Sequence, residues 1–108
     1  MPKIKIVVDT PSDIPDEDLV RYGIEMVGVP IVVDGEDFTE RRSFSVEEFY
    51  TVLTSAKELP VTSRVPMGEF VNAYTKAFRE GCTDIIVVTI NAGGSGTFDS
   101  ARMAIELF

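Results

Sequence analysis

The sequence contains no histidine, no tryptophan and a single cysteine, Cys82. One cysteine cannot form an internal disulfide bond. Without histidine or a second cysteine, the zinc sites that are built on those ligands are excluded, and so are the catalytic devices that pair serine or cysteine with histidine. These absences remove several large classes of metalloprotein and hydrolase.

Positive charge is also scarce, because 10 lysine and arginine residues face 18 aspartate and glutamate residues and leave a formal net charge of −8. Nucleic-acid binding depends largely on neutralising phosphates with basic side chains, so sequence-independent binding of nucleic acid is disfavoured. Apolar runs are all far shorter than the roughly 20 residues that cross a bilayer, and residues 1–6 lack the core of a signal peptide. We expect a cytoplasmic protein without a membrane span.

The 108 residues, 44% of them hydrophobic, suffice for one compact domain. Apolar runs predict strands at residues 3–9, 24–33 and 85–90, and helical spacing predicts helices that end near Gly23, Ser55, Gly81 and the end of the chain. Pro30 argues for a break in the second run, and Asp34-Gly35 favours a hairpin after it. This alternation predicts an α/β fold with a mostly parallel sheet flanked by helices, a Rossmann-like arrangement of three layers.

Three helices carry apolar side chains at helical spacing, and we expect each such stripe to face the core. The first of them follows Ser45 and Glu48, which have the spacing of a capping box. The predicted stripes are Val46, Phe49, Tyr50 and Leu53; then Phe70, Ala73, Tyr74, Ala77 and Phe78; then Ala101, Ala104, Ile105 and Phe108.

A glycine-rich segment, Asn91-Ala92-Gly93-Gly94-Ser95-Gly96-Thr97, follows the last predicted strand and opens the last helix. Its backbone amides and the positive end of the helix dipole favour a small anion. The spacing matches neither the phosphate loop of nucleotide-binding enzymes nor the glycine pattern of dinucleotide folds. The alternative is a plain strand-to-helix turn in which a hydroxyl caps the helix.

Two further groups of polar residues fall in predicted loops. Pro60-Val61-Thr62-Ser63-Arg64 offers two hydroxyls and a guanidinium, donors that suit a carboxylate or phosphate, although composition alone favours a solvated loop in which Ser63 or Thr62 caps the next helix. Asp9 and Asp13 flank the turn after the first strand and permit a second hypothesis, a Mg²⁺-dependent phosphotransferase or phosphatase. Their alternative is a structural role in the turn. Because strand ends of a parallel sheet meet at one edge, residues 9–13 and 91–97 are expected to share a crevice.

Taken together, five motifs occur in the order and spacing of the DegV family, which the chain resembles over essentially its whole length. They are Val8-Asp9-Thr10-Pro11-Ser12-Asp13-Ile14, Glu47-Glu48-Phe49-Tyr50, Pro60-Val61-Thr62-Ser63, Gly68-Glu69-Phe70, and Gly93-Gly94-Ser95-Gly96-Thr97 with Ser100-Ala101-Arg102. The resemblance implies a non-catalytic bacterial protein of two α/β domains that binds a long-chain fatty acid such as palmitate or oleate, without a cofactor. It also implies a role as lipid-carrying subunit of a fatty-acid kinase, in which a separate subunit binds ATP.

The resemblance assigns the fatty-acid carboxylate to two hydroxyls, those of Thr62 and Ser95. Supporting positions are Ser63, Arg64, Gly96, Thr97 and Asp9, with Arg64 placed to add a charge-assisted hydrogen bond. The family pattern has serines in place of Asn91 and Ala92, glutamine in place of Arg64, and proline followed by serine or alanine in place of Val65 and Pro66. Secondary contacts of the site are therefore expected to differ.

Family members are more than twice as long as this chain, and their second domain helps to enclose the lipid. We therefore expect the 108 residues to correspond to the amino-terminal domain alone, as an excised fragment, because the last predicted helix is apolar up to Phe108. With half of the enclosure absent, the isolated domain is expected to bind lipid more weakly than a longer parent.

Overall fold

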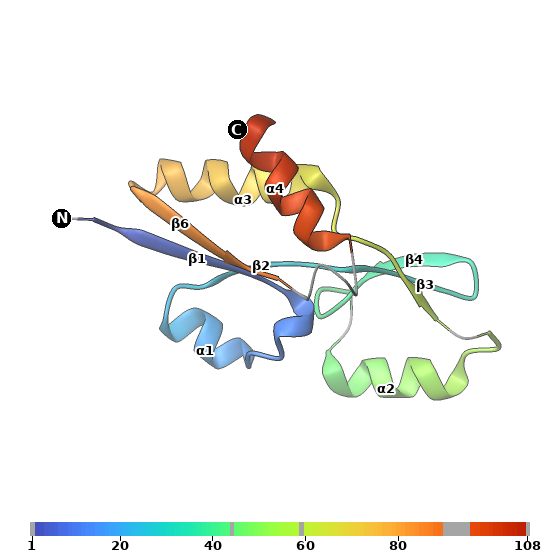
Figure 1. The fold of residues 1–108 in the computed structure, drawn as a ribbon. Helices are drawn as coiled ribbons and strands as arrows, with labels where there is room; N and C mark the ends of the chain where they lie inside the picture. Colours follow the sequence, from blue (N-terminus) through green and yellow to red (C-terminus); the bar gives the residue numbers. More distant parts are fainter. Residues whose placement is uncertain (1, 44, 59, 90–95, 108) are drawn as a thin grey trace.

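The computed structural model describes residues 2–43, 45–58, 60–89 and 96–107 (Figure 1). A parallel sheet of three strands forms its first half, with β1 (Ile4–Asp9) in the centre, β2 (Glu25–Val27) on one side and β6 (Asp84–Val88) on the other. The short helix α1 (Asp16–Arg21) lies on one face of this sheet, and α3 (Met67–Arg79) and α4 (Thr97–Leu107) lie on the opposite face (Figure 1). The predicted three layers are confirmed.

The core fills the face of this sheet that α3 and α4 cover. Val7 and Val27 of the strands pack there against Phe70, Tyr74 and Ala104 of the two helices. The alternation of a strand sends the neighbouring side chains to the other face. On that face Ile6, Ile86 and Val88 remain 38%, 50% and 53% exposed, because α1 is short. On this second face β1 is exposed at Ile4 and Ile6 and buried at Val8, which is 2% exposed.

A second sheet, antiparallel throughout, consists of β4 (Glu36–Thr39), β3 (Pro30–Val33) and β5 (Val61–Thr62). Pro30 begins β3 and so divides the predicted run 24–33 into β2 and β3, as expected. Asp34 and Gly35 both have positive φ, 49° and 83°, which a two-residue hairpin turn requires, so the predicted hairpin is confirmed. Two features were not predicted: β5, which occupies a segment interpreted as a linker, and a 3-10 helix, η1 (Thr10–Ser12).

Helix α2 (Val46–Ser55) begins at the predicted capping box and packs on the second sheet. Ser45 Oγ accepts a hydrogen bond from the Glu48 amide at 3.1 Å, and the Ser45 amide donates to Glu48 Oε1 at 3.0 Å. These bonds hold the Glu48 carboxylate in its charged form and lower the pKa of Glu48 below 4.5. The helix begins where the sequence predicts because two otherwise unpaired amides are satisfied there.

The predicted apolar stripes are correct in part. The second sheet is narrow, so α2 buries Phe49 and Val52 against Ile31 and Val33, whereas Tyr50 is 62% exposed and Leu53 37% exposed. In α3 the first four predicted residues are buried, but Phe78, in the last turn, is 69% exposed. In α4, Ala101 and Ala104 are buried and Ile105 is 64% exposed. The side chain of Val46 and the whole of Phe108 lie outside the described part of the chain.

Candidate functional site

A buried hydrogen bond joins the Thr62–Arg64 segment to the beginning of α4. The backbone amide of Val65 donates to Thr97 Oγ1 at 3.2 Å, and neither Val65 nor Thr97 has measurable solvent exposure. The two residues are 32 positions apart. This bond brings the donor segment at residues 60–64 next to Thr97, the last residue of the glycine-rich segment and the first of α4.

Strand β5 fixes the position of Thr62. Thr62 pairs with Ile31 of β3, and the amide of Ser63 donates to the carbonyl oxygen of Pro30 at 3.1 Å. Paired residues of an antiparallel ladder point to the same face of a sheet, so the side chain of Thr62 lies on the face that α2 covers. Thr62 and Ser63 are both exposed. Their backbone is therefore held by the sheet while their hydroxyls stay accessible.

Arg64 lies over Gly96, the residue that precedes α4. A Cβ atom at Gly96 would overlap the Nε, Cζ and Nη2 atoms of the Arg64 guanidinium, so the close approach requires glycine. Within the described ranges, no carboxylate forms an ion pair with Arg64, although Arg41, Arg42 and Arg102 each have one. In a chain with a net charge of −8, an exposed guanidinium held at a helix N-terminus without an acidic partner is suited to an anion.

The predicted supporting residues have distinct roles. Thr97 is fully buried and its hydroxyl accepts from Val65, so Thr97 positions the site. Gly96 gives room to Arg64, and its carbonyl oxygen accepts from the Ser100 amide at 3.1 Å. Ser95 and the rest of 90–95 lie outside the described residues. The assignment of Ser95 to the carboxylate, and the crevice shared by residues 9–13 and 91–97, therefore stay predictions.

The two aspartates of the second hypothesis differ in environment. Asp9 ends β1 and is 1% exposed, whereas Asp13 is exposed and has a left-handed backbone with φ 59°. Next to Asp9, Thr10 Oγ1 donates to Glu40 Oε2 at 2.9 Å and accepts from the Val29 amide at 3.1 Å, which ties the end of β1 to the second sheet. Among the described residues, no group of three or more acidic or cysteine side chains is arranged to hold a metal ion.

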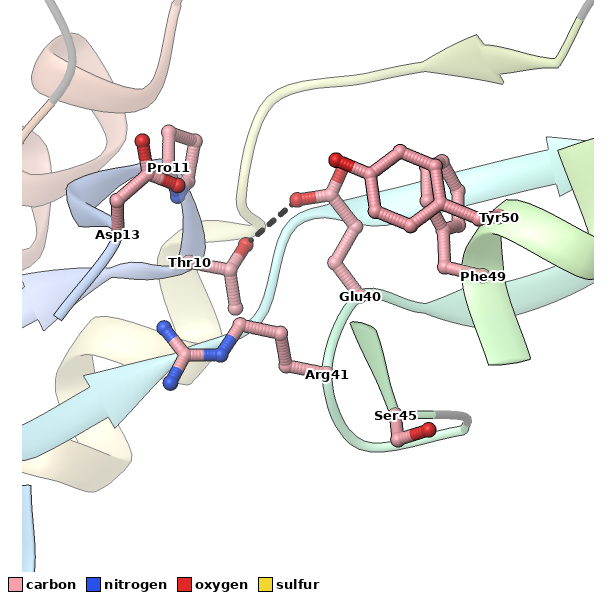
Figure 2. Close-up of a pocket in the computed structure, with 8 residues that line it drawn as sticks. All are labelled: Thr10, Pro11, Asp13, Glu40, Arg41, Ser45, Phe49 and Tyr50. Atoms are coloured by element: carbon pink, nitrogen blue, oxygen red, sulfur yellow. Dashed lines mark hydrogen bonds between the residues drawn. The ribbon is translucent and has the colours of Figure 1, made fainter. Parts of the chain in front are cut away.

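A cavity of about 380 Å³ lies where η1, the turn after β4 and the start of α2 meet (Figure 2). No motif in the sequence pointed to it, because its walls come from three separate segments. One local signal exists in the structure: Asp13 and Arg41, both in its wall, have positive φ of 59° and 61°. The lining residues are Thr10, Pro11, Asp13, Glu40, Arg41, Ser45, Phe49 and Tyr50.

Across the described ranges, no helix has the length and apolar character to cross a membrane.

Comparison with known proteins identifies relatives that match almost the whole chain. Residues 3–108 match the family described as "Uncharacterised protein, DegV family". A DegV domain-containing protein of Staphylococcus aureus is 32% identical over 106 residues, which are 97% of this chain and 37% of the relative. The chain thus spans little more than a third of the length of that relative.

Solved structures with the same fold include two from the family. A protein of Thermotoga maritima, whose structure revealed a fatty acid binding function, superposes with a TM-score of 0.92 at 28% identity, over 100% of this chain and 40% of its own. DegV of Bacillus subtilis, a fatty acid binding protein, superposes with a TM-score of 0.90 at 30% identity, over 99% of this chain and 38% of its own. With its fold, its motifs and 106 of its 108 residues in register, the chain belongs to the DegV family.

Proposed function

We propose that this protein binds a long-chain fatty acid and holds its carboxylate between Thr62 and Ser95. The observation that carries the proposal is the Val65 to Thr97 hydrogen bond, which joins the segment of Thr62 to the residue two positions after Ser95. The fatty acid binding of the Thermotoga maritima and Bacillus subtilis proteins supports the choice of ligand.

The head group would be held by donors of three kinds. The hydroxyls of Thr62 and Ser95 donate to the carboxylate oxygens, Arg64 adds a permanent positive charge, and the N-terminus of α4 adds the positive end of its dipole. Ser63 offers a further exposed hydroxyl. Asp9 is 1% exposed, so we assign it a structural role at the end of β1 and no direct contact with the carboxylate. Several donors are needed because a carboxylate loses strong hydration when it is bound.

The acyl chain requires apolar surface beside these donors. Phe98, which follows Thr97 in α4, is 46% exposed, and Val61, on the opposite face of β5 from Thr62, is 62% exposed. Each methylene removed from water contributes about 0.8 kcal/mol, so long chains are favoured over short ones. We therefore assign long-chain fatty acids as the ligand class and no catalytic residue to the chain itself.

Titration with palmitate tests this assignment. The double variant Thr62→Ala, Ser95→Ala should bind at least about tenfold more weakly, because hydrogen bonds to a charged group contribute about 1.5–3 kcal/mol each. The matched control is Thr51→Ala, Ser55→Ala, which removes two exposed hydroxyls from α2. Equal palmitate affinity for the two double variants would reject the head-group site.

We infer further that the protein presents its bound fatty acid to a separate ATP-binding kinase subunit in the cytoplasm. An exposed head-group segment supports this role, because a carboxylate held by Thr62 and Arg64 stays close to the surface. The test is acyl phosphate formation from palmitate and ATP by a fatty-acid kinase subunit, with and without this protein. No increase in acyl phosphate on adding the protein would contradict the carrier role and leave fatty-acid binding itself intact.

A further inference from the structure

We propose that the cavity between η1 and the start of α2 binds an organic cation, namely a primary ammonium or guanidinium group. The cavity holds about 380 Å³, within the range of about 300–1,000 Å³ found for small-molecule sites. Its walls combine two carboxylates, two aromatic rings and a set of hydroxyls (Figure 2). Each of these groups is suited to positive charge or to the carbon atoms next to it.

The carboxylates of the cavity wall leave it negatively charged. Arg41 also lines the cavity, but its Nη2 donates to Asp16 Oδ1 and to the carbonyl oxygen of Ile14, both at 2.6 Å, so Asp16 balances its charge. Glu40 accepts one hydrogen bond, from Thr10, on Oε2. In the described part of the chain, Asp13 has neither an ion pair nor a hydrogen-bond partner for its carboxylate. Two negative charges therefore face the cavity without a basic partner of their own.

The aromatic wall favours an organic cation over a bare ion. Tyr50 is 62% exposed, and Figure 2 shows its ring extending from α2 toward Glu40. Phe49 stands beside it, with ring centroids 6.3 Å apart. A cation over an aromatic face is attracted by the negative charge density of the ring, and the ring also covers the alkyl carbons next to the charge. A carboxylate beside such a ring is a common solution for recognising an amine.

An anion or a metal ion fits this cavity less well. The start of α2 would attract an anion, but the capping box already satisfies the amides of Ser45 and Glu48, and Glu47 and Glu48 add negative charge there. A divalent metal ion would take most of its ligands from water, since the described residues contain no group of three or more histidine, cysteine, aspartate or glutamate side chains arranged to hold one. Of these three ligand classes, the chemistry of the cavity wall therefore favours the organic cation.

Glu40 of the cavity wall and Thr62 of the carboxylate site lie on opposite sides of β3. The amide of Glu40 donates to Val29 on one side of β3, whereas the amide of Ser63 donates to Pro30 on the other side. β4 and β5 thus flank β3, and two strand spacings separate them, about 10 Å. Binding of an amine in the cavity and of a fatty acid at Thr62 is therefore tested in separate titrations.

The experiment is a titration of the protein with n-butylammonium chloride, followed by the backbone NMR signals of Asp13, Arg41 and Tyr50, against sodium chloride at equal ionic strength. Glu40→Gln should weaken binding about tenfold, because the amide oxygen still accepts from Thr10 while the charge is lost. Tyr50→Leu should weaken it severalfold by removing the aromatic face. The matched controls Glu36→Gln and Tyr22→Leu remove an equal charge and an equal exposed ring elsewhere and should change nothing.

Equal weakening by Glu40→Gln and Glu36→Gln would overturn the proposal, since it would show attraction by net charge alone. Tighter binding of inorganic phosphate, Mg²⁺ or palmitate at the same signals would also overturn it. A blocked lysine peptide provides the second arm. If the peptide binds more tightly than butylammonium, the natural ligand is a basic side chain of another protein. If butylammonium binds more tightly, the natural ligand is a free amine. Both results support an organic cation as the ligand of the cavity.

Discussion

The amide of Val65 and the hydroxyl of Thr97, both fully buried, form a hydrogen bond of 3.2 Å that fastens the exposed Thr62–Arg64 segment to the beginning of α4. An exposed pair of the same kind would compete with water at every moment. A buried pair cannot be exchanged for water, so it holds the candidate donors in one arrangement.

Thr97→Val should therefore cost both stability and ligand affinity. The variant leaves the Val65 amide buried without an acceptor, which costs about 1–3 kcal/mol and lowers the thermal midpoint by several degrees in a domain of this size. Thr97→Ser keeps the hydroxyl and is the control. Thermal unfolding followed by circular dichroism measures the difference, and a Thr97→Val protein as stable as Thr97→Ser would contradict the role assigned to this bond.

Gly96→Ala should weaken palmitate binding without unfolding the protein. The added Cβ overlaps the flexible end of Arg64, so the guanidinium moves away while the backbone of the segment stays in place. Gly68→Ala is the control, because a Cβ there meets nothing within 4 Å. Isothermal titration with palmitate makes the comparison. If Gly96→Ala binds palmitate as tightly as Gly68→Ala, the guanidinium has no part in holding the head group.

Affinity should rise with acyl-chain length and depend on the charge of the head group. Each methylene contributes about 0.8 kcal/mol, so every carbon added to the fatty acid increases affinity by about fourfold until the apolar surface is filled. Methyl palmitate, with the same chain and no charge, should bind much more weakly than palmitate. A series from decanoate to stearate with one constant affinity would show that the acyl chain is not bound.

Acid should destabilise the protein partly through Glu48. Its pKa is lowered in the folded state by hydrogen bonds from Ser45, so its contribution is complete above the unfolded value of 4.5 and is lost as the pH falls through the lower folded value. Glu48→Gln should flatten this part of the acid limb of a plot of stability against pH, whereas Glu17→Gln should not. An unchanged acid limb for Glu48→Gln would show that the capping box adds no pH-dependent stability.

Alkaline pH should destabilise the protein partly through Tyr74. Burial raises the pKa of this phenol above 10.0, and its hydroxyl donates to the carbonyl oxygen of Ala101 at 2.9 Å. A raised pKa means that the contribution of the neutral phenol is complete below 10.0 and is lost as the pH rises through the folded value. Tyr74→Phe should therefore be less stable at neutral pH and lose less stability in alkali. The exposed Tyr22→Phe serves as the control, and parallel alkaline limbs for both variants would refute the assignment.

Local signals in the sequence were reliable where one segment determines the outcome. The capping box at Ser45, the hairpin turn at Asp34-Gly35 and the break at Pro30 all lie where they were predicted, because each depends on residues within four positions of one another. Predictions of burial were less accurate. Tyr50 and Phe78 have the right spacing for a buried stripe, but the sheets beneath them are too narrow to cover them.

The candidate site divides in the same way. The order and spacing of the motifs predicted both the kinds of donor group and the family. Hydroxyls, glycines and a guanidinium can be identified from one segment of sequence, without knowing what they contact in the fold. The sequence could not show that Thr97 is a positioning residue, that Arg64 lies over Gly96, or that Glu40, Arg41 and Tyr50 line one cavity with Thr10.

The sequence by itself therefore determined the alternation of strands and helices, the excess of negative charge and the identity of the donor groups. Only the tertiary structure decided which of those groups face each other and which are buried. The physical reason is that hydrogen bonding and chain geometry act between neighbours along the backbone, whereas burial and long-range pairing depend on segments far apart in the chain, which meet only when the sheets and helices have packed.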